Sequence, residues 1–252
     1  MPALCGATTD TVMTVDRKLP WKRFATESFV IVTSILLAFA IDAWWEERQE
    51  QEAQLERLAR VAAEIEVNQA FIDRKLEILE GAIDATSVYL SWMSPDPESV
   101  TFEQYAQQWT VILDIGMFSL TRRSTDEYLG AGETTSPEQD QVRQALLEWY
   151  TEGDLITRQY ELLRAQHSDV AAYQISNETV PILATMIANP VMDRHPRSRF
   201  PTDTQSSLSD PREESLLAVY LIRMEFIVSR LRGFRQRQEA LVEDIRSTIG
   251  RD

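Results

Sequence analysis

One apolar segment near the start of the chain limits the folds that are open to it. Residues 24–45 read FATESFVIVTSILLAFAIDAWW, and residues 28–41 contain no charged side chain. A bilayer core about 30 Å thick needs about 20 helical residues, and at about 1.5 Å per residue the segment 24–45 spans about 33 Å. The sequence therefore predicts one transmembrane helix over 24–45, with a tail of residues 1–23 before it and a domain of residues 46–252 after it.

Four polar or small residues of this segment fall on one helix face because of their spacing. These candidate contacts for another membrane helix are Glu27, Ser34, Ala38 and Asp42. Ser34 and Ala38 form a small-xxx-small pair, which lets two helices approach closely. Two interpretations of the acids stay open: both lie hydrated at the membrane interfaces, or one meets a partner inside the membrane. Trp44 and Trp45 end the segment and are expected to anchor it at the interface.

The charges that flank the segment predict its orientation. Basic residues precede it and acidic residues follow it: Arg17, Lys18, Lys22 and Arg23, then Glu46, Glu47 and Glu50. The positive-inside rule places residues 1–23 in the cytoplasm and residues 46–252 outside, which is the periplasm if the segment crosses a bacterial inner membrane. The rival is a signal peptide cleaved after Ala40, because residues 38–40 fit the small-x-small pattern. The helical pattern continues through Trp45 without a break, which favours an uncleaved anchor.

The domain of residues 46–252 is acidic and contains no cysteine. Residues 1–45 carry four acids and four bases, so the chain's formal charge of −15 lies entirely after them. An acidic surface repels nucleic acid, so no nucleic-acid partner is expected. The single cysteine, Cys5, lies in the tail, and helix packing must therefore stabilise the domain without disulfides.

The spacing of apolar residues after the segment is typical of helices. Positions three and four residues apart form a heptad seam: Leu55, Leu58, Ala62, Ile65, Gln69, Ile72, Leu76, Leu79, Ile83, Thr86 and Leu90. No proline interrupts residues 21–94, so a long helix over 46–92 is expected to continue the transmembrane helix. The seam either pairs with another chain or packs on later helices of the same chain, and the later helices favour packing within the chain.

Further helices are expected near 102–115, 137–174, 180–188 and 211–249, with a loop over 189–211 where prolines are frequent. Thr101 with Gln104 predicts a capping box at the start of the second helix. Ser124 or Thr125 is expected to cap a short helix that ends at Gly130. The predicted fold class is mostly α, with the long helix packed in an antiparallel helical bundle.

Two motifs carry a resemblance to known proteins. The first is Glu27-x3-Ile31-Val32-x3-Leu36-Leu37-Ala38-x2-Ile41-Asp42-x-Trp44-x-Glu46-Glu47-Arg48, and the second is Asp126-Glu-Tyr-Leu-Gly-Ala-Gly132 followed by Val142–Leu146 and Trp149-Tyr150. Together they resemble a bacterial family of single-pass membrane proteins of unknown function. The chain departs from that family at Ala131-Gly132, where a Ser-Gly pair is usual, and in its longer tail. The resemblance implies the same topology and no particular activity.

Residues that carry out chemistry are sparse. His167 and His195 have no His or Cys neighbour at metal-ligand spacing, so both are expected at the surface, and neither a metal nor a cofactor is expected. Arg122 and Arg123 lie between apolar Leu120 and Tyr128 and are a weak candidate site for an anion such as a carboxylate or phosphate. The alternative is that the two arginines pair with the many acids of the domain.

These observations favour a membrane-anchored scaffold or accessory subunit that works through protein contacts. Its expected partner, besides the membrane, is another membrane protein or a second copy of the chain. The alternative is an extracytoplasmic helical domain that senses a small molecule. Because residues 1–23 are too few for an output domain, such a sensor signals through a partner membrane protein. An enzyme is not expected, since no catalytic constellation or phosphate-binding glycine loop is present in the sequence.

Overall fold

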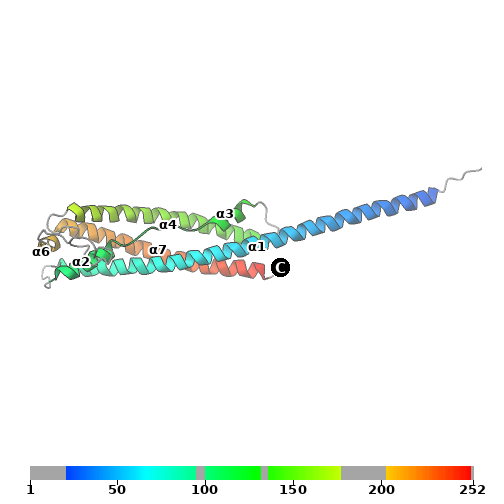
Figure 1. The fold of residues 1–252 in the computed structure, drawn as a ribbon. Helices are drawn as coiled ribbons and strands as arrows, with labels where there is room; N and C mark the ends of the chain where they lie inside the picture. The colour runs from blue at the N-terminus through cyan, green and yellow to red at the C-terminus, as the bar shows by residue number, and fades with distance from the viewer. Residues whose placement is uncertain (1–20, 95–99, 132–135, 177–202, 251–252) are drawn as a thin grey trace, which may run out of the picture. The chain divides into compact units, whose positions relative to one another are not determined.

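The structure is a computed structural model that describes residues 21–94, 100–131, 136–176 and 203–250. All regular secondary structure in these ranges is helical, which confirms the predicted mostly α class (Figure 1). The helices are α1 (Trp21–Trp92), α2 (Phe102–Ile112), α3 (Arg123–Gly130), α4 (Pro137–Ser176), α6 (Thr204–Leu208) and α7 (Pro211–Ile249). The chain divides into two units, residues 1–52 and 53–252, at a point within α1.

The described part of the first unit is the N-terminal portion of α1. Every side chain from residue 26 to residue 52 is exposed, including Phe29 at 71% and Phe39 at 66%. Within the described residues, one helix is long and apolar enough to cross a membrane, and the apolar stretch that qualifies it is near the N-terminus and unburied.

The second unit is built on three long helices: the part of α1 after residue 52, α4 and α7. Aromatic stacking, hydrogen bonds and an ion pair fix their directions. The contacts are Trp149–Phe234 and Leu162–Arg223 between α4 and α7, and Tyr89–Glu213 and Glu66–Arg246 between α1 and α7. In both pairs one residue number rises as the other falls, so α7 runs antiparallel to α1 and to α4. The helices α1 and α4 therefore run parallel to each other (Figure 1).

Two parallel helices need a connection that returns along their length. Residues 113–122, which we call the return segment, supply it without regular secondary structure. At about 3.3 Å per extended residue, ten residues cover about 33 Å, which is as far as about 22 residues of helix at 1.5 Å each. The segment passes from the end of α2 to the start of α3. Its residues 115–121 form no backbone–backbone hydrogen bond with any residue that the structure describes.

One helix end and one stretch of predicted loop differ clearly from the prediction. The capping box of Thr101 and Gln104 is present at the start of α2, but this helix ends at Ile112, three residues before the predicted end at 115. Gly116 adopts a φ of 60°, which turns the chain into the return segment.

Residues 204–208, predicted as loop, form α6, because Asp203 accepts a hydrogen bond from the Ser206 amide as its N-cap. The predicted helix 180–188 and loop residues 189–202 lie outside the described residues.

Both rows of the predicted seam face the core of the second unit, but the second row is mostly half-buried, with Ala62 its buried member. One predicted row is fully buried: Leu58, Ile65, Ile72, Leu79 and Thr86. The second buried row lies one residue before the predicted one: Val61, Asn68, Lys75, Ala82 and Tyr89. Asn68 and Lys75 are polar, so apolar periodicity does not include them. Both side chains bond to the return segment.

Candidate interaction sites

The four predicted membrane contacts lie in an uninterrupted α-helix, so they share one face of α1. All four side chains are exposed. The Ser34 hydroxyl donates to the Val30 carbonyl at 2.8 Å, a bond that satisfies the hydroxyl within its own helix. The rings of Trp44 and Trp45 lie 6.3 Å apart at the end of the apolar stretch, and both are more than half exposed.

The return segment is held by side chains in place of backbone partners. Asn68 Nδ2 donates to the Thr121 carbonyl at 2.7 Å, and the Thr121 amide donates to Asn68 Oδ1 at 2.9 Å. The side chain of Asn68 is 1% exposed. Backbone groups without a hydrogen-bond partner are costly when water is excluded. Thr121 has no backbone partner among the described residues, and the Asn68 side chain supplies partners for both its amide and its carbonyl.

Lys75 makes a second anchor. Its ammonium donates to the Ile115 carbonyl at 3.1 Å, and Tyr160 donates to the same oxygen. Burial lowers the pKa of Lys75, and the nearby Asp114 carboxylate offsets part of that change. Lys75 is the only lysine in residues 46–252. A Cβ on Gly116 would lie 2.8 Å from the Lys75 nitrogen, so the glycine both turns the chain and leaves space for the ammonium.

His167 does not lie at the surface as predicted. It is half-buried, its Nε2 lies 2.9 Å from the Leu113 carbonyl oxygen, and its ring packs near Tyr220. The imidazole thus anchors the first residue of the return segment. His195 is outside the described residues.

The cap of α3 comes from another helix. Neither Ser124 nor Thr125 is the N-cap; Arg122 holds that position and makes no side-chain cap bond. The carboxylate of Glu64 on α1 instead accepts the Ser124 amide at 2.7 Å and the Thr125 amide at 3.1 Å. Capping by a negative group is favourable at the positive end of a helix, so Glu64 fixes α3 to α1. Sequence spacing held no signal for a cap from so far along the chain.

Arg122 and Arg123 take different places. Arg122 forms an ion pair with Asp154, and its guanidinium lies 4.3 Å from the centre of the Tyr150 ring. Gly153 makes room for this contact, because a Cβ there would lie 2.7 Å from the Arg122 nitrogen Nη2. Arg123 is exposed and has no ion pair among the described residues. Arg122 therefore pairs with an acid of the domain, which is the second of its two predicted roles.

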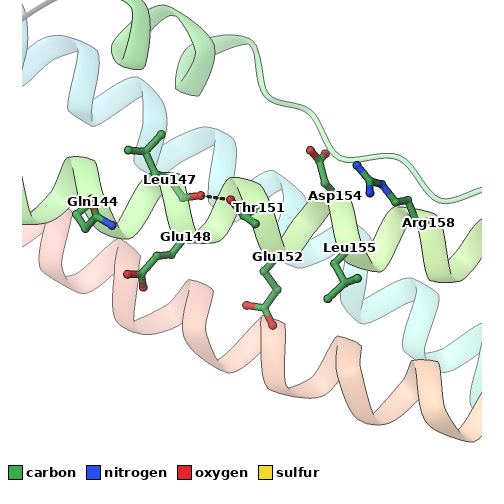
Figure 2. A pocket seen from close by; sticks show the side chains of 8 residues that line it. All are labelled: Gln144, Leu147, Glu148, Thr151, Glu152, Asp154, Leu155 and Arg158. Atoms are coloured by element: carbon green, nitrogen blue, oxygen red, sulfur yellow. Dashed lines mark hydrogen bonds between the residues drawn. The ribbon is translucent and has the colours of Figure 1, made fainter.

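A shallow surface hollow of about 600 Å³ lies along α4 (Figure 2). Its described lining comes from this one helix: Gln144, Leu147, Glu148, Thr151, Glu152, Asp154, Leu155 and Arg158. Two of its acids are already in ion pairs, Glu152 with Arg237 and Asp154 with Arg122. A hollow on a single helix face lacks the convergent polar groups that are typical of a small-molecule site.

Comparison with known proteins gives no relative, since no family model, no curated protein and no solved structure matches the chain. The resemblance to a bacterial single-pass family therefore stays a prediction. Among the residues that the structure describes, no group of three or more His, Cys, Asp and Glu side chains is arranged to hold a metal ion.

Proposed function

We propose that this protein is a single-pass membrane protein whose helical domain is a scaffold or accessory subunit of a membrane complex. The observation that carries the proposal is the exposed apolar stretch of α1, in a helix that continues to Trp92 and enters a packed core. Each Å² of apolar surface left in water costs about 25 cal/mol. A bilayer around residues 24–45 removes that cost, and the core keeps the second unit folded in water.

The use of polar residues in the second unit supports a structural role. Glu64, Asn68 and Lys75 are buried on α1, and each one bonds to the backbone of a segment far along the chain. Groups of this kind at an active site commonly face a cleft and a substrate. Here they face peptide groups, so their bonds build a rigid domain that can present its surface to a partner.

The flanking charges support an orientation with the N-terminus in the cytoplasm of a bacterium and the bundle in the periplasm, anchored in the inner membrane. Labelling of intact cells with a membrane-impermeant maleimide tests this. In a Cys5→Ser background, a cysteine at exposed Gln236 is expected to react before lysis. The native Cys5 is expected to react only after the membrane is opened. The reverse pattern would contradict the proposed orientation.

The function itself is tested by extracting the tagged full-length protein in a mild detergent at its native expression level. The size of the particle and the identity of every copurifying protein are then measured. The proposal predicts another membrane protein, or a second copy of the chain, in a fixed ratio. A bare monomer under several mild detergents would contradict the scaffold and direct attention to ligand binding by residues 46–252.

A further inference from the structure

A buried carboxylate lies at the end of the bundle where α2 and α6 cover the core. Glu213, in the first turn of α7, is 1% exposed. Its Oε1 accepts a hydrogen bond from Tyr89 on α1, and its Oε2 accepts one from Ser207 on α6 at 2.7 Å. Ser207 lies 2.9 Å from the hydroxyl of Tyr105 on α2, and Gln174 on α4 donates to Tyr105 at 3.1 Å. One polar cluster thus joins five of the six described helices, all except α3.

The protonation state of Glu213 sets the direction of these bonds. An ionised carboxylate only accepts, so Tyr89 and Ser207 must both donate to it. The Ser207 oxygen then accepts from Tyr105, whose oxygen accepts from Gln174. A protonated Glu213 donates its own proton, so one of these two hydroxyls must accept a hydrogen bond from it in place of donating one. The cluster is therefore sensitive to a single proton.

Among the residues that the structure describes, the groups that face Glu213 include no cation. Tyr89, Tyr105, Gln174 and Ser207 face it from four helices. Besides burial, the like charge of the N-cap residue Asp210, at the start of the same helix, acts on Glu213 and raises its pKa. Among the described residues, no Lys, Arg or His forms a salt bridge with Glu213 within 4.0 Å.

Two effects favour the ionised form, and burial opposes them. The amino end of α7 is the positive end of the helix dipole, and two hydroxyls donate to the carboxylate. Burial is the larger effect and raises the pKa of Glu213 above its ordinary value, while the bonds from Tyr89 and Ser207 offset part of that rise. The folded state therefore holds the proton more tightly than an opened state, in which water reaches the carboxylate.

We propose that Glu213 is a proton-controlled latch, which holds α2 and α6 against α7 when it is protonated and loosens them when it ionises. The latch goes beyond the proposed function and needs no partner. The sign follows from linkage. A carboxyl whose pKa is raised in the closed state stabilises that state fully below its ordinary pKa, and this stability is lost as pH rises through the raised value. Loosening therefore accompanies a rise in pH.

Amide hydrogen exchange of the full-length protein in detergent micelles, between pH 4 and pH 8, tests the latch. After correction for the intrinsic exchange rate, protection of residues 203–210 and 102–112 is expected to fall as pH rises. Within the window that starts near the ordinary pKa of glutamate, the opening constant is expected to increase up to about tenfold per pH unit for one proton. Glu213→Gln, which carries no charge at any pH, is expected to remove this dependence.

Glu214→Gln is the matched control, because Glu214 is the next residue of the same helix and is exposed. This variant is expected to keep the pH dependence of the wild type. The same pH dependence in Glu213→Gln and in the wild type would overturn the latch. If Glu213→Gln does not fold, Tyr89→Phe decides, since it removes one donor to the ionised form. In Tyr89→Phe the fall of protection with pH should continue to a higher pH than in the wild type. A plot of protection against pH that is not shifted would overturn the proposal.

Discussion

The side-chain amide of Asn68 pairs with both backbone groups of Thr121, with donor–acceptor distances of 2.7 and 2.9 Å. The two bonds have the same donor and acceptor pattern as a pair of backbone hydrogen bonds in a β-sheet. Here they join a helix side chain to a segment without regular secondary structure. They hold the end of the return segment, just before α3, against α1. The Thr121 backbone groups would otherwise lack a partner among the described residues.

Asn68→Ala is expected to lower the free energy of unfolding by about 1–3 kcal/mol, because it removes both hydrogen bonds to the Thr121 backbone at a partly buried contact. Gln69→Ala is the matched control. Gln69 is the next residue, is half-buried, and its Nε2 has no hydrogen-bond partner among the described residues. Chemical denaturation of the full-length protein in mild detergent measures both. Equal losses in the two variants would contradict the role given to Asn68.

The Asn68 contact also shows which features of the fold the sequence predicts and which it does not. Helix type and extent follow from local signals, such as the unbroken run to Trp92, the capping box at Thr101 and Pro211 after Asp210. The burial of Asn68 and Lys75 does not follow from local signals, because polar side chains are typical of a helix surface. It depends on the return segment, to which both side chains bond. A seven-residue spacing does link Val61, Asn68, Lys75, Ala82 and Tyr89. The row is recognisable from the sequence when polar residues are accepted as members of a heptad row.

The predicted contact face of the N-terminal apolar stretch shows the opposite case. Glu27, Ser34, Ala38 and Asp42 share a side because the helix is regular there, so local spacing was sufficient to place them. The two arginines show a third case. Their sequence neighbourhood gave no means of telling Arg122, which reaches α4, from Arg123, which is exposed.

Arg122→Ala is expected to destabilise the protein by about 1–3 kcal/mol, since it removes the ion pair of the mostly buried guanidinium with Asp154 and its cation–π contact with Tyr150. Arg123→Ala is expected to change stability by less than about 0.5 kcal/mol, as is usual for an exposed side chain. Thermal unfolding in detergent compares them. A stable Arg122→Ala variant that no longer supports the protein's complex would instead indicate a ligand or partner site at Arg122.

Two glycines in helix interiors are expected to respond to alanine with opposite signs. Gly81 has no atom within 4 Å of a built Cβ, so Gly81→Ala should add up to about 1 kcal/mol through helix propensity. At Gly153 the same Cβ would lie 2.7 Å from Arg122 Nη2 and 2.9 Å from Leu120 Cδ1. Gly153→Ala should therefore displace Arg122 and destabilise the protein by about 1–3 kcal/mol. Stabilisation by both substitutions would show that the close approach at Gly153 is absent.

Alkaline pH is expected to unfold the bundle through its buried tyrosines. Burial raises the pKa of Tyr160 to about 12 from an ordinary value of 10.0. The unfolded chain therefore loses this proton before the folded chain does. Stability that is fully present below about pH 10 is lost as pH rises towards 12. Phenolate absorbance and helical circular dichroism should change together in that range, and Tyr160→Phe should reduce the slope. Ionisation of tyrosine without loss of helix would contradict this.

The most direct test of the account asks whether the polar face of the membrane helix meets a partner in the cell. A photoreactive amino acid is placed at Ala38 or at Ala40, two alanines that lie about 200° apart around the helix. After illumination of living cells, the account predicts a defined protein adduct from position 38 and little or none from position 40. Equal yields from both positions, or no adduct from either, would contradict a membrane scaffold that binds through the face of Glu27, Ala38 and Asp42.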